Sequence, residues 1–185
     1  KNTTLQLGLS HNFDDVRMAD EKTWKDKQST AGIIGISQLL SPTTVYSAAF
    51  TFANDSGYLN DPYRLAEYHP DGFPADFSIG VPERRPSHRN KYILFNSLTH
   101  YFTSLDASLE GSYRFYYDTF SIVSHTVEVG WHQWLFGRHL MLEPVARFSQ
   151  QSAASFYTTR FSGPFDTDPP GFHSSDYRLS ELYTI

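Results

Sequence analysis

The sequence predicts an all-β fold in which long antiparallel strands follow one another up and down, and three observations lead to this prediction. The stretch ASLEGSYRFYYD, residues 107–118, alternates with a period of two, so Tyr113 and Phe115 share one face while Glu110, Ser112 and Arg114 share the other. Aromatic residues make up 16% of a chain whose mean hydropathy is negative, which suits strands with one apolar and one polar face. No segment approaches the roughly 20 consecutive apolar residues of a membrane-spanning helix.

The first three predicted strands cover residues 4–13, 30–40 and 44–53. In the first strand the apolar residues Leu5, Leu7, Leu9 and Phe13 recur on one face. The second strand is separated from the third by a tight turn around Pro42. The third strand has Tyr46, Ala48, Phe50 and Phe52 on one face.

The remaining predicted strands cover residues 90–102, 105–117, 121–134, 138–150 and 175–185. The faces of 90–102 are the least sorted, whereas 105–117 includes the stretch quoted above. Strand 121–134 has Val123, Val127, Val129 and Trp131 on one face, and strand 138–150 has Leu140, Leu142, Ala146 and Phe148. The last segment begins a further strand.

The connections between these strands alternate strictly between short and longer. Tight turns lie near residues 41–43, 103–104 and 136–137, whereas long loops cover about 14–29, 54–89 and 151–174, and a medium connection covers 118–120. Every tight turn therefore falls at one end of the sheet and every longer loop at the other. This is the plan of an outer-membrane β-barrel, with short periplasmic turns and long extracellular loops. Soluble up-and-down barrels have no reason to sort their loops in this way.

Strand length and the placement of aromatic residues favour the same transmembrane barrel. Strands of roughly 10 to 14 residues match the 9 to 11 that cross a bilayer when tilted. Aromatic residues near the strand ends form the expected interfacial girdles: Tyr101, Phe102, Trp134 and Phe136 at the turn end, and Phe13, Phe52, Tyr117 and Phe120 at the loop end. The apolar face is then expected to meet lipid and the polar face the lumen. The alternative is a soluble β-sandwich with an aromatic core.

Composition narrows the functional classes. The chain has no cysteine, which excludes disulfides and thiolate metal sites, and its net charge of −5 gives no basic surface for nucleic acid. Of the eight histidines, His125 and His132 are predicted to lie on opposite strand faces, and no pair is spaced i, i+2, so we predict no metal site. Ser121 and Ser124 lie close to His125 in sequence but lack a nucleophile elbow, so we expect neither an enzyme nor a cofactor.

Five blocks of sequence resemble a known family. SGYLNDPYR (56–64), RRPSHRNK (84–91), YRFYYDTFSIVSHTVEVG (113–130), PVARFSQQSAASFY (144–157) and SSDYRLS (174–180) are similar to the bacterial family catalogued as domain of unknown function 3570. The resemblance implies an outer-membrane β-barrel of a Gram-negative bacterium, longer than this chain. It also implies partners in the cell envelope, namely a small lipoprotein or a periplasmic redox protein, and so a link to extracytosolic redox chemistry.

Because the chain ends LSELYTI, without the usual terminal aromatic strand, we expect about eight strands of a larger barrel. The alternative is that eight strands close into a small barrel filled by side chains.

Two groups of residues are candidates for function. The first is a charge network on the lumen face of three consecutive strands: Glu110, Arg114, Glu128, His132, Glu143 and Arg147. Each charge would find a partner or water there, either as a structural network or as a permeation path that selects the solute. The second is a set of loop anchors: Asp61, Tyr63, Arg64, Arg84 and Arg85. Arg84 and Arg85 are expected to bind lumen carboxylates.

Two functional hypotheses follow from these features. The first is a pore or conduit, or housing for an envelope partner. The second is a non-conducting binding or scaffold protein with a filled lumen and ligand-binding loops. Conductance and the state of the lumen distinguish them.

Overall fold

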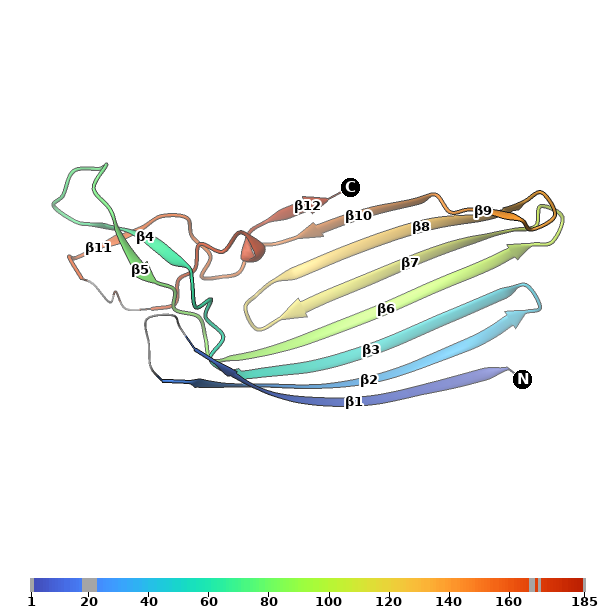
Figure 1. The fold of residues 1–185 in the computed structure, drawn as a ribbon, viewed down its shortest axis with the longest axis horizontal. Helices are drawn as coiled ribbons and strands as arrows, with labels where there is room; N and C mark the ends of the chain where they lie inside the picture. Colours follow the sequence, from blue (N-terminus) through green and yellow to red (C-terminus); the bar gives the residue numbers. More distant parts are fainter. Residues whose placement is uncertain (1, 18–22, 167–168, 170, 185) are drawn as a thin grey trace.

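One long antiparallel sheet dominates the computed structural model, which describes residues 2–17, 23–166, 169 and 171–184 (Figure 1). Its strands are β1 (Thr3–Val16), β2 (Lys25–Ser41), β3 (Thr44–Gly57), β6 (His88–Phe102), β7 (Ala107–Asp118), β8 (Val123–Leu135), β10 (Val145–Gln151) and β12 (Leu182–Thr184), in that spatial order, with β9 (Leu140–Leu142) also paired to β8. In the described residues no helix is long and apolar enough to cross a membrane.

The sheet confirms the predicted all-β, antiparallel, up-and-down arrangement. Every pair of neighbouring strands is antiparallel, and the order of the strands across the sheet follows their order along the chain. Among the described residues the sheet is open, because β1 and β12 lie at its two edges without pairing to each other. Closure into a barrel therefore stays a prediction.

Several strands extend beyond the predicted bounds. β1 continues to Val16 and β2 begins at Lys25, so this pair continues well into the segment predicted as a loop, with Asp14 opposite Lys27. Of the predicted segments, residues 18–22, 167–168, 170 and Ile185 lie outside the described residues.

A second, small sheet lies within the predicted loops. β4 (Leu65–Pro70) pairs with β5 (Ile79–Pro82) and with β11 (Phe161–Gly163), which brings the loop after β3 together with the segment after β10. The 3₁₀ turn η1 (Tyr177–Leu179) follows. Figure 1 shows the small sheet beyond the loop end of the long strands. We call the described residues of 58–87, 119–122 and 152–181 the cap.

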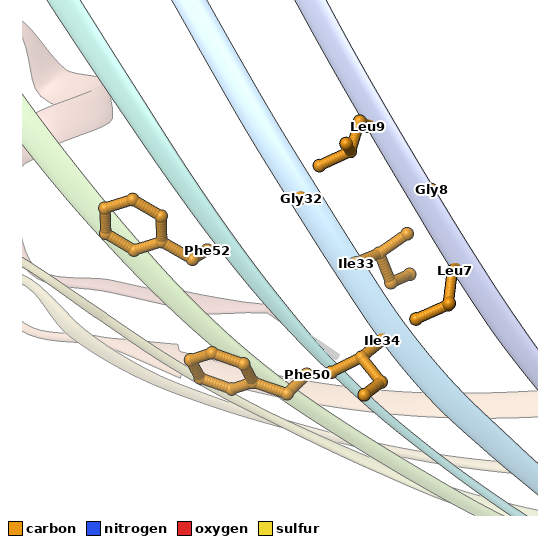
Figure 2. A pocket seen from close by; sticks show the side chains of 8 residues that line it. All are labelled: Leu7, Gly8, Leu9, Gly32, Ile33, Ile34, Phe50 and Phe52. Atoms are coloured by element: carbon orange, nitrogen blue, oxygen red, sulfur yellow. The ribbon is translucent and has the colours of Figure 1, made fainter.

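The register sorts the side chains of the long sheet into an apolar and a polar face. Leu7 lies opposite Ile34, Ile34 opposite Phe50, and Phe50 opposite Leu94, so one apolar face is continuous across four strands. Figure 2 shows this face over β1, β2 and β3, where Leu7, Leu9, Ile34, Phe50 and Phe52 surround a hollow of about 390 Å³.

The apolar face is the more exposed of the two. Leu9 is 92% exposed and Leu7 78%. On the polar face of β2, Ala31 and Ile33 are half-buried and Gly35 is buried. On the apolar face of the same strand, Ile34 and Ile36 are exposed. A sheet that curves around its polar face produces this difference, because side chains on the concave side converge.

Most of the buried apolar side chains lie in the cap rather than in the long sheet. One cluster joins Phe120, Ile122, Ala154 and Leu179, and a second joins Ala66, Tyr68 and Val81. Tyr116, from the polar face of β7, packs against the first cluster. The cap therefore lies against the polar face at the loop end of the strands.

Aromatic side chains of the apolar face also gather near the loop end. Phe52, Tyr92 and Tyr117 are adjacent across β3, β6 and β7, with ring centroids 5.3 and 6.1 Å apart. Phe52 and Tyr117 were predicted here, whereas Tyr92 was not. The prediction for Phe120 is wrong, because this side chain is 2% exposed within the cap core.

Candidate functional site

The predicted charge network lies on the polar face, but only as separate pairs. Glu128 is opposite Arg147 in register, with 3.9 Å between Glu128 Oε2 and Arg147 Nε. His132 Nδ1 lies 3.5 Å from Glu143 Oε1. Arg114 lies over the ring of Phe95, 6.0 Å from its centroid. The structure thus joins four of the six predicted residues in two pairs and leaves Arg114 apart from them.

Glu110 is the remaining member of this network. It lies opposite Thr99 on β6 and Gly130 on β8, two neighbours without charge. The side chains of Glu128 and Arg147 are 42% and 58% exposed, so their ion pair contributes only about 0–1 kcal/mol to stability. The network therefore presents charge on the polar face and does little to hold the fold together.

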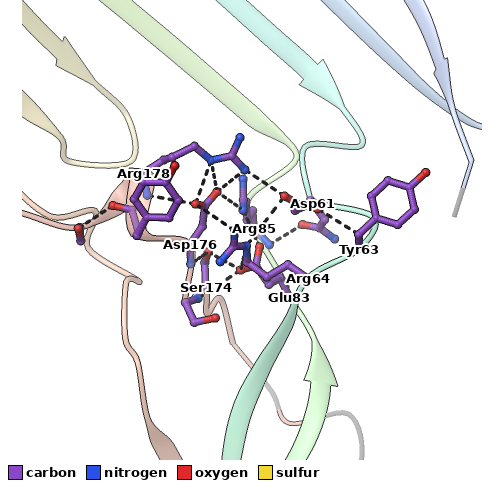
Figure 3. Close-up of polar contacts among 12 residues, drawn as sticks. Asp61, Tyr63, Arg64, Glu83, Arg85, Ser174, Asp176 and Arg178 are labelled. Atoms are coloured by element: carbon purple, nitrogen blue, oxygen red, sulfur yellow. Dashed lines mark hydrogen bonds and ion pairs between the residues drawn. The ribbon is translucent and has the colours of Figure 1, made fainter.

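The predicted loop anchors instead meet a buried ionic cluster within the cap (Figure 3). Arg85 Nη2 lies 2.5 Å from Glu83 Oε2 and 3.0 Å from Asp176 Oδ2. Glu83 is 3% exposed and Asp176 1%. The expectation that Arg85 binds lumen carboxylates is wrong, because both of its partners belong to the loops. The physical reason is that the loops fold on each other and supply buried carboxylates of their own.

Arg64 and Asp61 complete this ionic cluster. Arg64 lies 3.9 Å from Glu83 and 3.8 Å from Asp176, and Asp61 accepts a hydrogen bond of 3.0 Å from Arg178 Nη2. The cluster therefore joins the segment after β3 to the segment around η1, through contacts between residues 91 to 117 positions apart in the sequence.

Tyr63 and Arg84 take part through their backbones. The Tyr63 amide donates to the Asp61 carboxylate, but the Tyr63 side chain is exposed. Arg84 and His173 exchange two backbone hydrogen bonds of 3.1 and 2.8 Å. These bonds bridge Arg84 to the loop after β11, and the expectation that its side chain binds a lumen carboxylate stays a prediction.

The charge of Asp176 is stabilised despite its burial. Burial raises the pKa of this carboxyl, but hydrogen bonds from the Arg178 side chain and amide, together with the charge of Arg85, outweigh burial and hold the pKa at about 2. Asp176 also caps η1 by accepting from the Arg178 amide. Ser174 Oγ donates to Glu83 at 2.9 Å, which satisfies the second buried carboxylate.

A second buried carboxylate centre, Asp118, was not singled out from the sequence. Asp118 is fully buried, and its Oδ2 accepts from Arg89 Nε at 2.8 Å and from the Tyr116 hydroxyl at 2.5 Å. Its Oδ1 accepts from the backbone amides of Phe120 and Ile122 at 2.9 and 3.1 Å. An aspartate at the start of a short connection, positioned to bind amides two and four residues later, is the signal that identifies it.

The described residues hold no group of three or more side chains arranged to bind a metal ion. This end of the molecule presents fixed arginine, lysine and carboxylate charges around the end of the polar face.

Comparison with known proteins adds a family. The family model described as "Protein of unknown function (DUF3570)" matches residues 1–185. The chain belongs to this family. Comparisons with curated proteins and with solved structures find no match.

The blocks that carry the DUF3570 resemblance meet at the loop end of the structure. Asp61 and Arg64 come from the first block, Arg85 and Arg89 from the second, and Asp118 from the third. The fourth block supplies Ala154 to the cap core and the fifth supplies Asp176 and Arg178 to the ionic cluster. The candidate site of this DUF3570 chain is therefore the cap together with the polar face against which it lies.

Proposed function

We propose that this chain forms part of the wall of a Gram-negative outer-membrane β-barrel, and that the barrel acts as a conduit or as housing for an envelope partner. The observation that supports this most directly is the exposure of the apolar face. Its large exposed side chains include Leu5, Leu7, Leu9, Phe13, Ile34, Ile36, Phe50, Phe52, Leu94, Leu98, Leu109, Tyr113, Tyr117, Val127, Val129 and Phe148.

Water is a poor environment for such a face. Fully burying a large apolar side chain is worth about 1.5–3 kcal/mol, and these sixteen are about half exposed on average, so covering the face would gain on the order of 10–25 kcal/mol. A typical domain has a net stability of only about 5–15 kcal/mol. The face must therefore be covered, and lipid chains match a surface that is apolar along and across the strands.

The dimensions of the strands also fit a membrane. Tyr92 and Phe102 are aromatic residues of the apolar face in β6, ten residues apart, with Phe102 at the end of the strand and Tyr92 four residues after its start. Ten residues span about 33 Å along a strand, which becomes about 25 Å along the membrane normal at a tilt near 40°. This is the height of the apolar band in outer-membrane barrels.

The polar face favours a conduit because it holds fixed charges of both signs, including Glu110 and Arg114 in β7. The cap favours the second candidate, a binding or scaffold protein with a filled lumen, because it packs against the end of the same face through Tyr116. In either case, a small lipoprotein or a periplasmic redox protein is the partner that we propose.

Cysteine substitution tests the assignment of the faces, because the printed sequence has no cysteine of its own. Ser97 and Leu98 are neighbours in β6 and point to the polar and the apolar face respectively. In the full-length protein in outer membranes, we expect Ser97→Cys to react with a water-soluble maleimide. Leu98→Cys is expected to react only after denaturation.

The other outcomes are equally informative. Reaction at both positions would indicate a soluble sheet and refute the membrane proposal, and reaction at Leu98 alone would reverse the faces. Protection at both would favour the filled lumen. Planar-bilayer recording provides the second readout: a conduit should conduct, and Glu110→Gln or Arg114→Gln should change its ion selectivity. Mass spectrometry of co-purifying proteins tests for the partner.

A further inference from the structure

A cavity of about 310 Å³ lies between the polar face and the cap. Lys27, Asp55 and Lys91 line it from β2, β3 and β6. Leu59 and Phe120 line it from the cap. The cavity is at the lower end of the size range of sites for small ligands.

Cations predominate among the residues that line this cavity. Lys27, Arg85, Arg89 and Lys91 are positively charged, whereas Asp55 is the single carboxylate in the described wall. Asp55 forms an ion pair with Lys91. The carboxylates that bind the two arginines are buried and do not line the cavity.

Carboxylates hold Arg85 and Arg89 in place but bind only part of each guanidinium group. Arg85 binds Glu83 and Asp176, and Arg89 binds Asp118, in each case through Nε and Nη2. Their Nη1 atoms have no hydrogen-bond partner among the described residues. Buried carboxylates thus orient two guanidinium groups at the wall of a cavity, and guanidinium groups suit phosphate and carboxylate ligands.

Lys27 is the most available cation of the wall. In the described part of the chain its ammonium group has neither a hydrogen bond nor an ion pair within 4.0 Å. It interacts with the charge of Asp55, and Asp14 lies opposite it on β1 but outside the cavity wall. An anion in the cavity would gain a direct contact with Lys27 without breaking an existing pair.

The rest of the wall is mixed, with the polar Asn60 and the Tyr58 ring beside four apolar residues. Val16, Leu59, Pro62 and Phe120 line the cavity, and Arg89 lies over the Phe120 ring, 4.6 Å from its centroid. A ligand that matches both kinds of wall has an anionic group and a small apolar body.

We propose that this cavity binds a small organic anion, with its phosphate or carboxylate group against Lys27 and the arginine edges and its apolar body against Phe120. The inference goes beyond the proposed function, because every wall residue belongs to this chain and the site does not require the sheet to close. In a barrel, the site would lie on the solute's path at the loop end.

Isothermal titration of the full-length protein in detergent tests the proposal with phenyl phosphate and benzoate as probes and phenol as the neutral control. We expect both anions to bind, phenol to bind far more weakly, and affinity to fall with added salt. Lys27→Gln should weaken anion binding about tenfold, since a hydrogen bond to a charged group is lost. Lys27→Arg should restore binding. Arg138→Gln, which removes an exposed cation at the turn end of the sheet, should leave binding unchanged.

Several results would overturn the proposal. Equal binding of phenol and phenyl phosphate would mean that only the apolar wall recognises ligands. Unchanged affinity in Lys27→Gln, or equal losses in Lys27→Gln and Arg138→Gln, would place the anion elsewhere. Absence of binding of either anion to the unsubstituted protein at millimolar concentration would also refute it, whatever the variants show. These results do not depend on the maleimide test, so failure of one proposal is distinguishable from failure of the other.

Discussion

Replacing Asp118 by Asn should loosen the connection between β7 and β8 while leaving the long sheet paired. Asn keeps an oxygen for the amides of Phe120 and Ile122, which lie 2.9 and 3.1 Å from Asp118 Oδ1. It replaces Oδ2, the acceptor for Arg89 and Tyr116, with an NH₂ group that cannot accept. Three donors then lose their acceptor at a fully buried position.

The magnitude follows from the burial of the partners. Breaking a buried ion pair by removing one partner costs about 3–5 kcal/mol. The Arg89 side chain is 22% exposed and can partly rehydrate, so we expect the lower end, about 3 kcal/mol. That corresponds to about a hundredfold rise in the population of the open connection.

Hydrogen exchange of the backbone amides of residues 119–122 measures this opening directly. The matched control is Glu128→Gln, which also removes a carboxylate from an arginine, but from a pair separated by 3.9 Å with both side chains well exposed. We expect that control to change exchange less than about fivefold. Equal effects of the two substitutions, or a change below about fivefold in Asp118→Asn, would refute the prediction that Asp118 holds the connection between β7 and β8 closed.

Two further predictions concern the cap and the end of β3. Because the pKa of Asp176 is lowered from 3.8 to about 2, its charge stabilises the cap above pH 4 by about 2 kcal/mol, and this contribution is lost as the pH falls from about 4 to about 2. Proteolysis near η1 should increase over that range, and Asp176→Asn should remove the pH dependence. Gly57→Ala should cost more than about 2 kcal/mol, because Gly57 has a φ of +98° and an added Cβ would collide with the Asp26 carbonyl. Urea unfolding should show a clearly smaller loss for Gly72→Ala, where φ is +83° and nothing lies within 4 Å.

Most strands of the long sheet were predictable because their signal is local, but the predicted strand 138–150 is divided into β9 and β10, and the predicted strand 175–185 contains η1 and only the short β12. Each strand has its own alternation of apolar and polar residues. A shift of one residue in the strand register would move all of its apolar side chains to the other face. The strand ends were less predictable. β1 and β2 continue past Phe13 through Asp14 and Asp15, which pair with Lys27 and Asp26, and polar residues on both faces give no alternation to detect.

The cap was only partly predictable because its contacts are distant in the sequence. Arg85 and Asp176 are 91 residues apart, and nothing local to either residue indicates the other. The charged residues of the loop could be selected as anchors, but their partners could not be assigned. Likewise, Asp118 continues the alternation of β7, so its position in the strand pattern conceals its five hydrogen bonds.

The difference between sheet and cap indicates where the specific function of this DUF3570 chain resides. A residue on the apolar face needs only to be apolar, so many different side chains could replace Leu94 or Val127. Asp118 must offer a carboxylate to a guanidinium, a hydroxyl and two amides at once, and Ser174 must donate to a buried Glu83. Ionic groups at fully buried positions are costly unless each is satisfied. These centres stabilise the loops and also orient Arg85 and Arg89 at the cavity wall, so we infer that they fix the geometry of the cationic cavity beside them.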